Sequence, residues 1–229
     1  MRVVRLRGRT RLVEQGDVVS DLLHAPGPTH DLFDVLAAAL AACEPGPSTA
    51  FLGFAAGGIV APLRAAGYDG TVHAVDISAA GWKIFEPIAR DWPGRVSFHA
   101  QDARSWLLAR RSPLDAILED LSVPGRGGHV KPGLSFGELP RLAHRKLAAR
   151  GVVVTNLLPP EDRSFGAALR AVAAPAKSAV VVTGEEWENR VVVAGRRTLD
   201  GRAFGRALRE KLEAIGSEEA GRIRVARVS

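Results

Sequence analysis

The chain has little of several residue types that would place a protein in a particular class. Among its 229 residues there is a single cysteine, Cys43, which excludes an intrachain disulfide. The histidines have no metal-ligand spacing and form no cluster with a cysteine, so we predict no metal site. The Walker sequence and the G-x-S-x-G sequence are also missing, which argues against a P-loop protein or a serine hydrolase.

Long hydrophobic runs are absent as well. No apolar run approaches the roughly 20 residues that a membrane-spanning helix needs. The longest candidate, residues 35–43, is short and rich in alanine. The first 17 residues alternate charged and apolar side chains and have no apolar core of the kind that a secretory signal contains. We therefore expect a protein that does not enter the membrane and is located in the cytoplasm.

Aromatic residues make up only 6% of the chain, while the net charge is +6. Excess positive charge can indicate a polyanionic partner. Here, however, arginine is spread over nearly every segment, no basic run exceeds a few residues, and no aromatic residues alternate with the basic ones. We therefore predict that nucleic acid is not the partner.

Apolar strands and amphipathic helices alternate over most of the sequence. We predict strands at residues 49–53, 71–75, 96–100, 114–119 and 152–156, and helices at residues 32–42, 58–66, 82–91, 103–110, 139–149 and 202–215. The strands are apolar throughout rather than alternating, which is typical of a parallel sheet covered by helices on both faces. The fold class is therefore α/β, with a doubly wound sheet.

The two ends of the chain depart from this alternation. Residues 3–19 contain two short strands around Gly8-Arg9, which indicates a small β-hairpin extension within residues 1–30. Near the other end, the β-branched runs 179–183 and 190–194 are joined by a short polar link, which indicates an antiparallel hairpin. An exposed N-terminal hairpin can also pair with a second copy, so a homodimer is a further expectation.

The most informative stretch is residues 49–76, which combines a strand, a Gly/Ala turn, a short helix and a strand ending in an acid. Backbone can approach a ligand closely at Gly53, Ala55, Gly57 and Gly58, and the helix that follows offers free N–H groups to an anion. Asp76 follows Gly53 by about 23 residues, near the spacing at which a carboxylate meets ribose hydroxyls. A tight turn without a ligand and a solvated or capping acid remain the alternatives.

Further acids follow the neighbouring strands, whose carboxyl ends share one crevice in a parallel sheet. Asp102 can accept a hydrogen bond from the amine of an adenine, cap the next helix, or do both. Glu119 and Asp120 can orient an amine or accept its proton, although charged residues often only mark a strand end. The Gly-rich loop at residues 125–133 is a candidate lid, and its His129 is either a base or a solvated side chain.

Taken together, these motifs resemble the class I S-adenosylmethionine-dependent methyltransferases, in particular their spermidine synthase-like branch. The resemblance is carried by FLGFAAGG (51–58), HAVDIS (73–78), FHAQDARSWL (98–107) and LDAILEDLSVPG (114–125), and by the reversed strand of the C-terminal hairpin. It implies a Rossmann-like domain over residues 31–229 that binds S-adenosylmethionine. The N-terminal hairpin is similar to the small β-extension of spermidine synthases.

The resemblance also implies roles for the residues at the matching positions. The methionine and ribose moieties would contact Gly53, Ala55 and Gly57, and the ribose would also contact Asp76. The adenine would contact Ile77, Asp102 and Ala103. The catalytic candidate, Asp120, would bind the cofactor's amino group or act on the acceptor.

The implied activity is methyl transfer to a small-molecule acceptor, whose contacts we expect in residues 20–31, 123–138 and 157–165. Polyamine synthases have a second acid where this chain has Val123, so aminopropyl transfer from decarboxylated S-adenosylmethionine is the alternative, with Glu119 as a replacement acid. The alanines of the first motif leave a non-catalytic binding protein open. An NAD-dependent oxidoreductase shares the G-x-A-x-x-G pattern, but the terminal hairpin argues against it.

Overall fold

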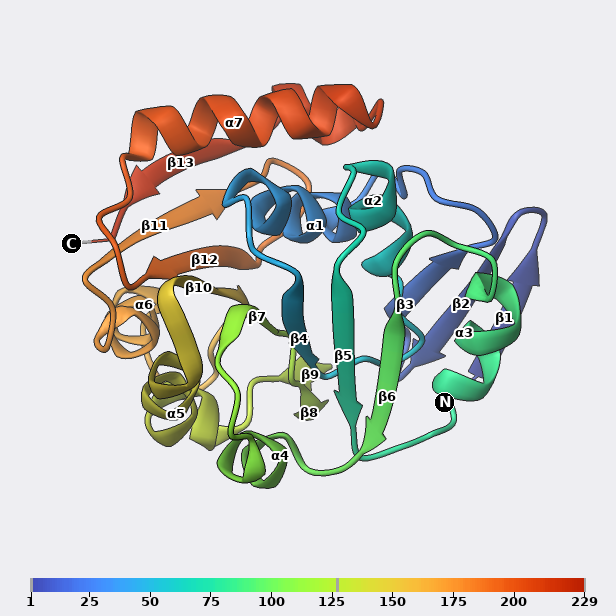
Figure 1. Ribbon diagram of the computed structural model, residues 1–229, viewed down its shortest axis with the longest axis horizontal. Helices are drawn as coiled ribbons and strands as arrows, with labels where there is room; N and C mark the ends of the chain where they lie inside the picture. Colours follow the sequence, from blue (N-terminus) through green and yellow to red (C-terminus); the bar gives the residue numbers. More distant parts are fainter. Residues whose placement is uncertain (1, 127, 229) are drawn as a thin grey trace.

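A mixed eight-stranded sheet forms the centre of the computed structural model, which describes residues 2–126 and 128–228 (Figure 1). The order of strands across the sheet is β13-β11-β12-β10-β7-β4-β5-β6. The strands are β4 (Ser48–Leu52), β5 (Thr71–Asp76), β6 (Val96–Ala100), β7 (Leu114–Glu119), β10 (Leu147–Leu157), β11 (Ser178–Thr183), β12 (Arg190–Gly195) and β13 (Arg224–Arg227).

The strands β6, β5, β4, β7 and β10 pair in parallel, as the apolar pattern predicts. Strand β12 lies between β10 and β11 and is antiparallel to both, so the predicted C-terminal hairpin is confirmed. Strand β13, which sequence analysis missed, pairs antiparallel with β11 and extends the sheet. The result is the predicted doubly wound sheet with a reversed strand near its C-terminal edge.

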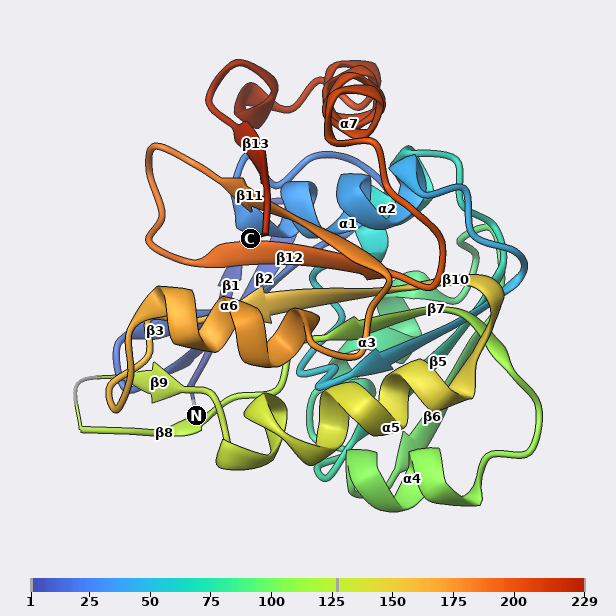
Figure 2. The ribbon, with the colours of Figure 1, turned by 90° about the vertical axis from the view of Figure 1, so that its left-hand side faces the viewer.

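Helices cover both faces of this sheet (Figure 2). Figure 2 shows α1, α2 and α7 on one side and α4, α5 and α6 on the other. The helices are α1 (Leu32–Ala42), α2 (Val60–Ala65), α3 (Trp82–Ala89), α4 (Ala103–Ala109), α5 (Glu138–Lys146), α6 (Phe165–Ala173) and α7 (Gly201–Ala214), with short 3₁₀ turns η1 (Gly133–Phe136) and η2 (Glu218–Gly221). Within the described residues, none of these helices combines the length and apolar character that crossing a membrane requires.

Successive residues of the central strands enter opposite helical layers. Phe51 and Leu118 pack in the cluster that contains α1 and α2, whereas Leu52 and Ile117 pack with α4 and α5. All four side chains are almost completely buried. Because adjacent strand residues point to opposite faces, burial on both faces requires an apolar residue at every position, and this explains the non-alternating pattern.

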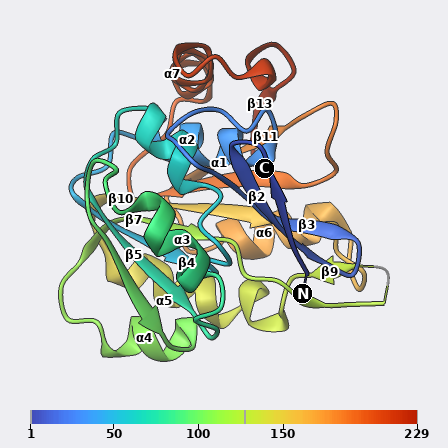
Figure 3. The same ribbon diagram turned by 90° about the vertical axis from the view of Figure 1, so that its right-hand side faces the viewer.

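The N-terminal extension is a three-stranded antiparallel sheet in the order β1-β2-β3 rather than a simple hairpin (Figure 3). Its strands are β1 (Arg2–Leu6), β2 (Arg9–Glu14) and β3 (Asp17–Leu23). The predicted pairing of β1 with β2 is confirmed, while β3 was missed. Leu12 and Leu22 are fully buried on its inner face, so this sheet is packed onto the main domain.

Helix α6 also escaped sequence analysis. It provides the crossover between β10 and the parallel-running β11, which two parallel strands require. Ser164 caps it, because its hydroxyl accepts a hydrogen bond from the N–H of Ala167 at 3.2 Å. The Gly-rich loop contains a two-residue ladder between β8 (Val123–Pro124) and β9 (His129–Val130); Gly127 lies outside the described residues.

Candidate functional site

The carboxyl ends of β4, β5, β6 and β7 lie side by side in the sheet, and those of β5 and β6 point downwards in Figure 1. The register pairs Leu52 with both Val75 and Glu119, and Asp76 with Ala100. The segments that follow these strands contain the residues predicted for cofactor binding and catalysis. The structure therefore places the predicted residues at one edge of the sheet, which we call the carboxyl edge.

The Gly/Ala turn after β4 depends on left-handed backbone. Gly53 and Gly57 have φ of 83° and 70°, and Ala55 has φ of 47° although it carries a side chain. A Cβ at Gly53 would lie 2.5 Å from the Asp120 carbonyl oxygen. The turn therefore packs directly against the chain that leaves β7, and only glycine fits at position 53.

Asp76 binds the turn itself. Its Oδ2 accepts hydrogen bonds from the N–H groups of Phe54 and Ala55, both at 2.9 Å, and its Oδ1 accepts one from Ser78 at 2.9 Å. A carboxylate can accept about four hydrogen bonds. Asp76 therefore orders the turn and keeps room for about one more donor, on Oδ1, where a ribose hydroxyl could bind.

Ile77 is the most exposed of the large hydrophobic side chains in the described chain, at 82%. It follows Asp76 at the carboxyl edge. The segment behind it closes onto the turn, because any side chain at Gly81 would overlap the Ala55 carbonyl group. An exposed isoleucine at this position offers an apolar surface for a flat ring, as the resemblance implies.

The N-terminal sheet packs over Gly58, and of the N–H groups predicted to be free beyond it, that of Val60 donates to the Gly57 carbonyl at 2.9 Å. The N–H of Gly58 donates to Oγ of Ser20 in β3, at 3.0 Å and in a buried position. A Cβ at Gly58 would lie 2.9 Å from the N–H of Asp21. The N-terminal sheet, which the sequence did not place here, thus covers Gly58, and α2 has only six residues.

Phe54 turns its ring into the core rather than toward the carboxyl edge. Its side chain is 4% exposed and contacts Phe85 edge-on, with ring centroids 5.1 Å apart, together with Trp82 and Phe98. The aromatic residue in the first motif is therefore a packing residue. Its ring does not compete with a ligand for the space outside the turn.

Asp102 caps α4, since its Oδ1 accepts from the N–H of Ser105 at 2.8 Å. This bond uses one carboxylate oxygen of an exposed side chain, so the capping alternative is present and adenine binding is compatible with it. Ala103 is 5% exposed and packs in the core cluster with Val75 and Leu107. Its methyl group is turned into the core.

Asp120 is half-buried and accepts a hydrogen bond from an amide. Burial raises its pKa from 3.8 to about 6, while Lys131 and the hydrogen bond from Asn156 oppose the rise and Glu119 adds to it. Nδ2 of Asn156 donates to Oδ1 of Asp120 at 2.7 Å, and Nδ2 of Asn189 donates to Oδ1 of Asn156 at 2.8 Å. The carboxyl group can therefore exchange a proton near neutral pH.

Sequence analysis missed both asparagines. Asn156 is visible as a polar residue at the end of an apolar strand, which is the same signal that identified Asp120. Asn189 belongs to the polar link between β11 and β12, where polar residues are ordinary. Only the reversed β12 brings that link beside β10.

Glu119 is buried, and its carboxylate is hydrogen-bonded within the protein. Its Oε1 accepts from Nζ of Lys131 at 2.8 Å, from Oγ of Ser135 at 3.2 Å and from the N–H of Leu121 at 3.1 Å. The side chains of Glu119 and Lys131 are 5% and 1% exposed. Glu119 is therefore not free to replace the second acid of a polyamine synthase.

His129 is neither solvated nor isolated. Its Nε2 lies 3.1 Å from Oε2 of Glu14 and its Nδ1 lies 3.3 Å from Oδ2 of Asp17. These contacts tie the Gly-rich loop to the N-terminal sheet. Across residues 2–126 and 128–228, no group of three or more His, Cys, Asp or Glu side chains is arranged to hold a metal ion.

Several solved structures share this arrangement at low sequence identity. Spermidine synthase from Thermotoga maritima superposes with a TM-score of 0.64 and 14% identity, over 96% of this chain and 79% of its own. Human methyltransferase-like protein 13 in complex with S-adenosylhomocysteine gives 0.60 and 18%, over 81% and 91%. The O-methyltransferase TomG from Streptomyces achromogenes in complex with S-adenosylmethionine gives 0.52 and 14%, over 71% and 78%.

The chain therefore has the class I methyltransferase fold, which spermidine synthase shares, and the predicted fold class and resemblance are confirmed. No protein-family model and no curated protein matches the sequence.

Proposed function

We propose that this chain binds S-adenosylmethionine at the carboxyl edge and transfers the methyl group to a small-molecule acceptor. The observation that carries the proposal is the direct packing of the Gly53 turn against Asp120, a carboxyl group whose pKa is about 6. A ligand lying over the turn would present its reactive end to this group. S-adenosylmethionine, when bound, supplies a methyl group on a sulfonium, which is a good leaving group.

The residues at the carboxyl edge fit an adenosine-containing ligand. Ile77 offers an exposed apolar surface for the adenine, and Asp102 keeps one carboxylate oxygen for its amine. Asp76 keeps about one acceptor position for a ribose hydroxyl, because the turn uses the others. The ring of Phe54 and the side chain of Ala103, both buried, leave this surface uncovered.

Asp120 would take the proton of the acceptor's attacking heteroatom. A base whose pKa lies near the working pH combines a useful ionised fraction with proton affinity. Asn156 keeps one carboxylate oxygen in a fixed direction, so the other oxygen can face the acceptor. Positioning of the acceptor and exclusion of water would supply the rest of the rate increase.

Methyl transfer is favoured over aminopropyl transfer by the groups near Asp120. A cationic amine acceptor needs further negative charge, yet Glu119 is neutralised by Lys131 and Val123 occupies the position of the second acid. An assay of the two possible donors decides between methyl and aminopropyl transfer. Purified protein is offered S-adenosylmethionine or its decarboxylated form together with a diamine, and aminopropyl product would overturn the methyl assignment.

Calorimetry with S-adenosylhomocysteine tests the binding site. Replacement of Ile77 by aspartate should weaken binding by about tenfold or more, because an apolar contact worth roughly 1.5 kcal/mol is lost. The exposure of Ile77 means that folding stability should not change. The matched control is Leu108→Asp on α4, another exposed apolar residue at 48%, which should bind like the parent chain.

Folded protein that binds neither S-adenosylmethionine nor S-adenosylhomocysteine would overturn the proposal. Binding without transfer to any heteroatom acceptor would instead favour the non-catalytic binding protein. A homodimer through the exposed edge strand β1 and a cytoplasmic location stay predictions, which gel filtration and cell fractionation test.

A further inference from the structure

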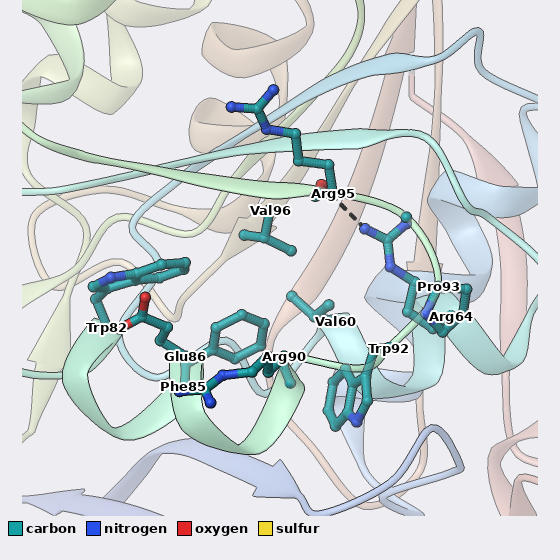
Figure 4. Close-up of a pocket in the computed structure, with 12 residues that line it drawn as sticks. Val60, Arg64, Trp82, Phe85, Glu86, Arg90, Trp92, Pro93, Arg95 and Val96 are labelled. Atoms are coloured by element: carbon teal, nitrogen blue, oxygen red, sulfur yellow. Dashed lines mark hydrogen bonds between the residues drawn. The ribbon is translucent and has the colours of Figure 1, made fainter.

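A cavity of about 320 Å³ lies between α2, α3 and the segment that leads into β6 (Figure 4). Its lining includes Val60 from α2, Ala89 from α3 and Val96 at the first position of β6. The predicted cofactor and catalytic residues do not contribute to this lining. The cavity is therefore separate from the carboxyl edge, and the proposed function leaves it without a role.

Aromatic rings form much of the cavity wall. Figure 4 shows Trp82 on one side, Trp92 on the other and Phe85 between them. Trp82 stacks on Phe98 at 5.3 Å with an interplanar angle of 11°, and Phe85 meets Trp92 edge-on at 5.8 Å. Because these contacts fix the rings, the wall is already shaped for a flat apolar group.

Arg64 brings a buried positive charge to the same cavity. Its side chain lines the cavity, although the residue is only 5% exposed. Its Nη1 donates to the carbonyls of Tyr68 at 2.6 Å and Gly70 at 3.0 Å, and its Nη2 donates to that of Arg95 at 3.3 Å (dashed in Figure 4). Among the described residues no carboxylate forms an ion pair with it, although the Asp69 carboxylate is near enough to favour its charge, and its Nε has no hydrogen-bond partner.

A buried guanidinium without a counter-ion is unfavourable, because carbonyl dipoles compensate only part of the lost hydration. The burial lowers the pKa of Arg64, which is the expected sign for a charge in such surroundings. Arg90 adds a second positive charge at the exposed rim, opposed there by Glu86. An anion in the cavity would place a negative charge beside the buried guanidinium of Arg64.

We propose that this cavity is a second ligand site, which takes a small planar anion whose aromatic ring lies between Trp82 and Trp92 and whose acidic group pairs with Arg64. A cavity of this volume is at the small end of ligand pockets, so one or two rings fit. The site does not depend on the methyltransferase proposal, since the two share none of their lining residues.

The test uses 2-naphthoate and its uncharged analogue 2-naphthalenemethanol, which have the same ring. Indole N–H resonances of the protein are followed during titration and assigned with single Trp→Phe variants. We expect 2-naphthoate to shift the signals of Trp82 and Trp92 and to leave those of Trp106 and Trp187 in place. The alcohol should bind at least about tenfold more weakly, because it brings no negative charge to the guanidinium.

Two variants separate binding from folding. Ala89→Phe fills the cavity and should abolish both indole shifts while Arg64 keeps its structural bonds to the three carbonyls. Arg64→Met should lose the preference for the anion, with circular dichroism and S-adenosylhomocysteine binding as checks of the fold. Arg111→Gln, an exposed arginine outside the cavity, is the matched control and should behave like the parent chain.

Equal affinity for the acid and the alcohol would overturn the assignment of an anion. Folded protein in which millimolar 2-naphthoate leaves Trp82 and Trp92 unshifted would overturn the site itself. Neither outcome touches S-adenosylhomocysteine binding at the carboxyl edge, so failure here is distinguishable from failure of the proposed function.

Discussion

The turn at residues 53–58 and the end of β7 lie against each other, yet their polar groups are used differently. In the turn, Asp76 accepts three backbone hydrogen bonds and the N–H of Gly58 is held by Ser20. At the end of β7, Asp120 is half-buried beside Asn156, and its pKa is about 6. In the turn, most hydrogen-bonding groups are paired within the protein. At the end of β7, a carboxyl group can still gain or lose a proton.

This difference assigns separate tasks to the two regions. The turn provides a fixed surface, because the groups that could move or titrate are already bonded within the protein. The end of β7 provides chemistry, because a raised pKa makes the carboxyl group responsive near neutral pH. Variants of the turn should therefore change shape and stability alone, whereas variants at the end of β7 can also change the proton affinity of Asp120.

The largest expected effect is the loss of folding stability when the buried ion pair between Lys131 and Glu119 is broken. Lys131→Met leaves the carboxylate of Glu119 buried without a counter-ion, and we expect a loss of about 3–5 kcal/mol in the free energy of unfolding. Urea denaturation measures it. Arg104→Met, which removes an exposed pair with Glu138, is the control and should cost at most about 1 kcal/mol. Equal losses would show that the buried pair has no special role in the β7 region.

The next effect tests the shape of the turn. Gly53→Ala forces a Cβ to within 2.5 Å of the Asp120 carbonyl at a φ of 83°. We expect a loss of about 3 kcal/mol, from backbone strain and overpacking together. Gly67→Ala is a matched control, because its φ is 88° but nothing lies within 4 Å of the new Cβ.

For Gly67→Ala, strain alone should cost about 1 kcal/mol. If both alanine variants unfold at the same urea concentration, the close packing of the turn against β7 does not contribute to stability. The turn would then not act as the fixed surface that distinguishes it from the end of β7.

Much of the fold was readable because central strands buried on both faces need unbroken apolar runs. Helix α1 and strands β6 and β7 begin and end at the predicted residues. Strand β3 was missed because it contains Asp21, which is buried only through ion pairs with Arg9 and Arg11 on the neighbouring strand. Such pairing depends on strand register, which a single pass along the sequence does not provide.

The candidate site was predictable in position but not in bonding. Chain order placed Asp76, Asp102 and Asp120 after parallel strands, and parallel strands bring their ends to one edge. That Asp76 would bond the turn depends on backbone N–H directions, and that Asn189 would reach Asn156 depends on the reversal of β12. These are properties of three-dimensional geometry, for which residue type and spacing give no direct signal.

A smaller effect follows from the proton on Asp120. Since the folded-state pKa is about 6 and the ordinary value is 3.8, its contribution to stability is fully present below about pH 4 and is lost as the pH rises through 6. Asp120→Asn removes this dependence. We expect equal stability near pH 4 and a gain of at most about 3 kcal/mol above pH 7. A pH series of urea melts checks this, and a constant difference across that range would contradict the raised pKa.

The smallest effect isolates the hydrogen bond from Asn156. Asn156→Leu keeps the size of the side chain but removes the donor to Asp120, and because that bond favours the carboxylate, the pKa of Asp120 should move above 6. Stability near neutral pH should fall by about 1 kcal/mol. Carboxyl ¹³C NMR follows the titration, and the acidic limb of any pH–rate profile should move with it.

Asn189→Leu is the matched control, since Asn189 bonds Asn156 and reaches Asp120 only through it. It should shift the pKa in the same direction by less. If the two leucine variants shift it equally, Asn156 cannot hold its orientation without Asn189, and the region that carries the chemistry extends from β7 to the link before β12. If neither shifts it, burial and the charges of Lys131 and Glu119 set the proton affinity of Asp120 without the asparagines, and the contrast with the hydrogen-bonded turn becomes larger.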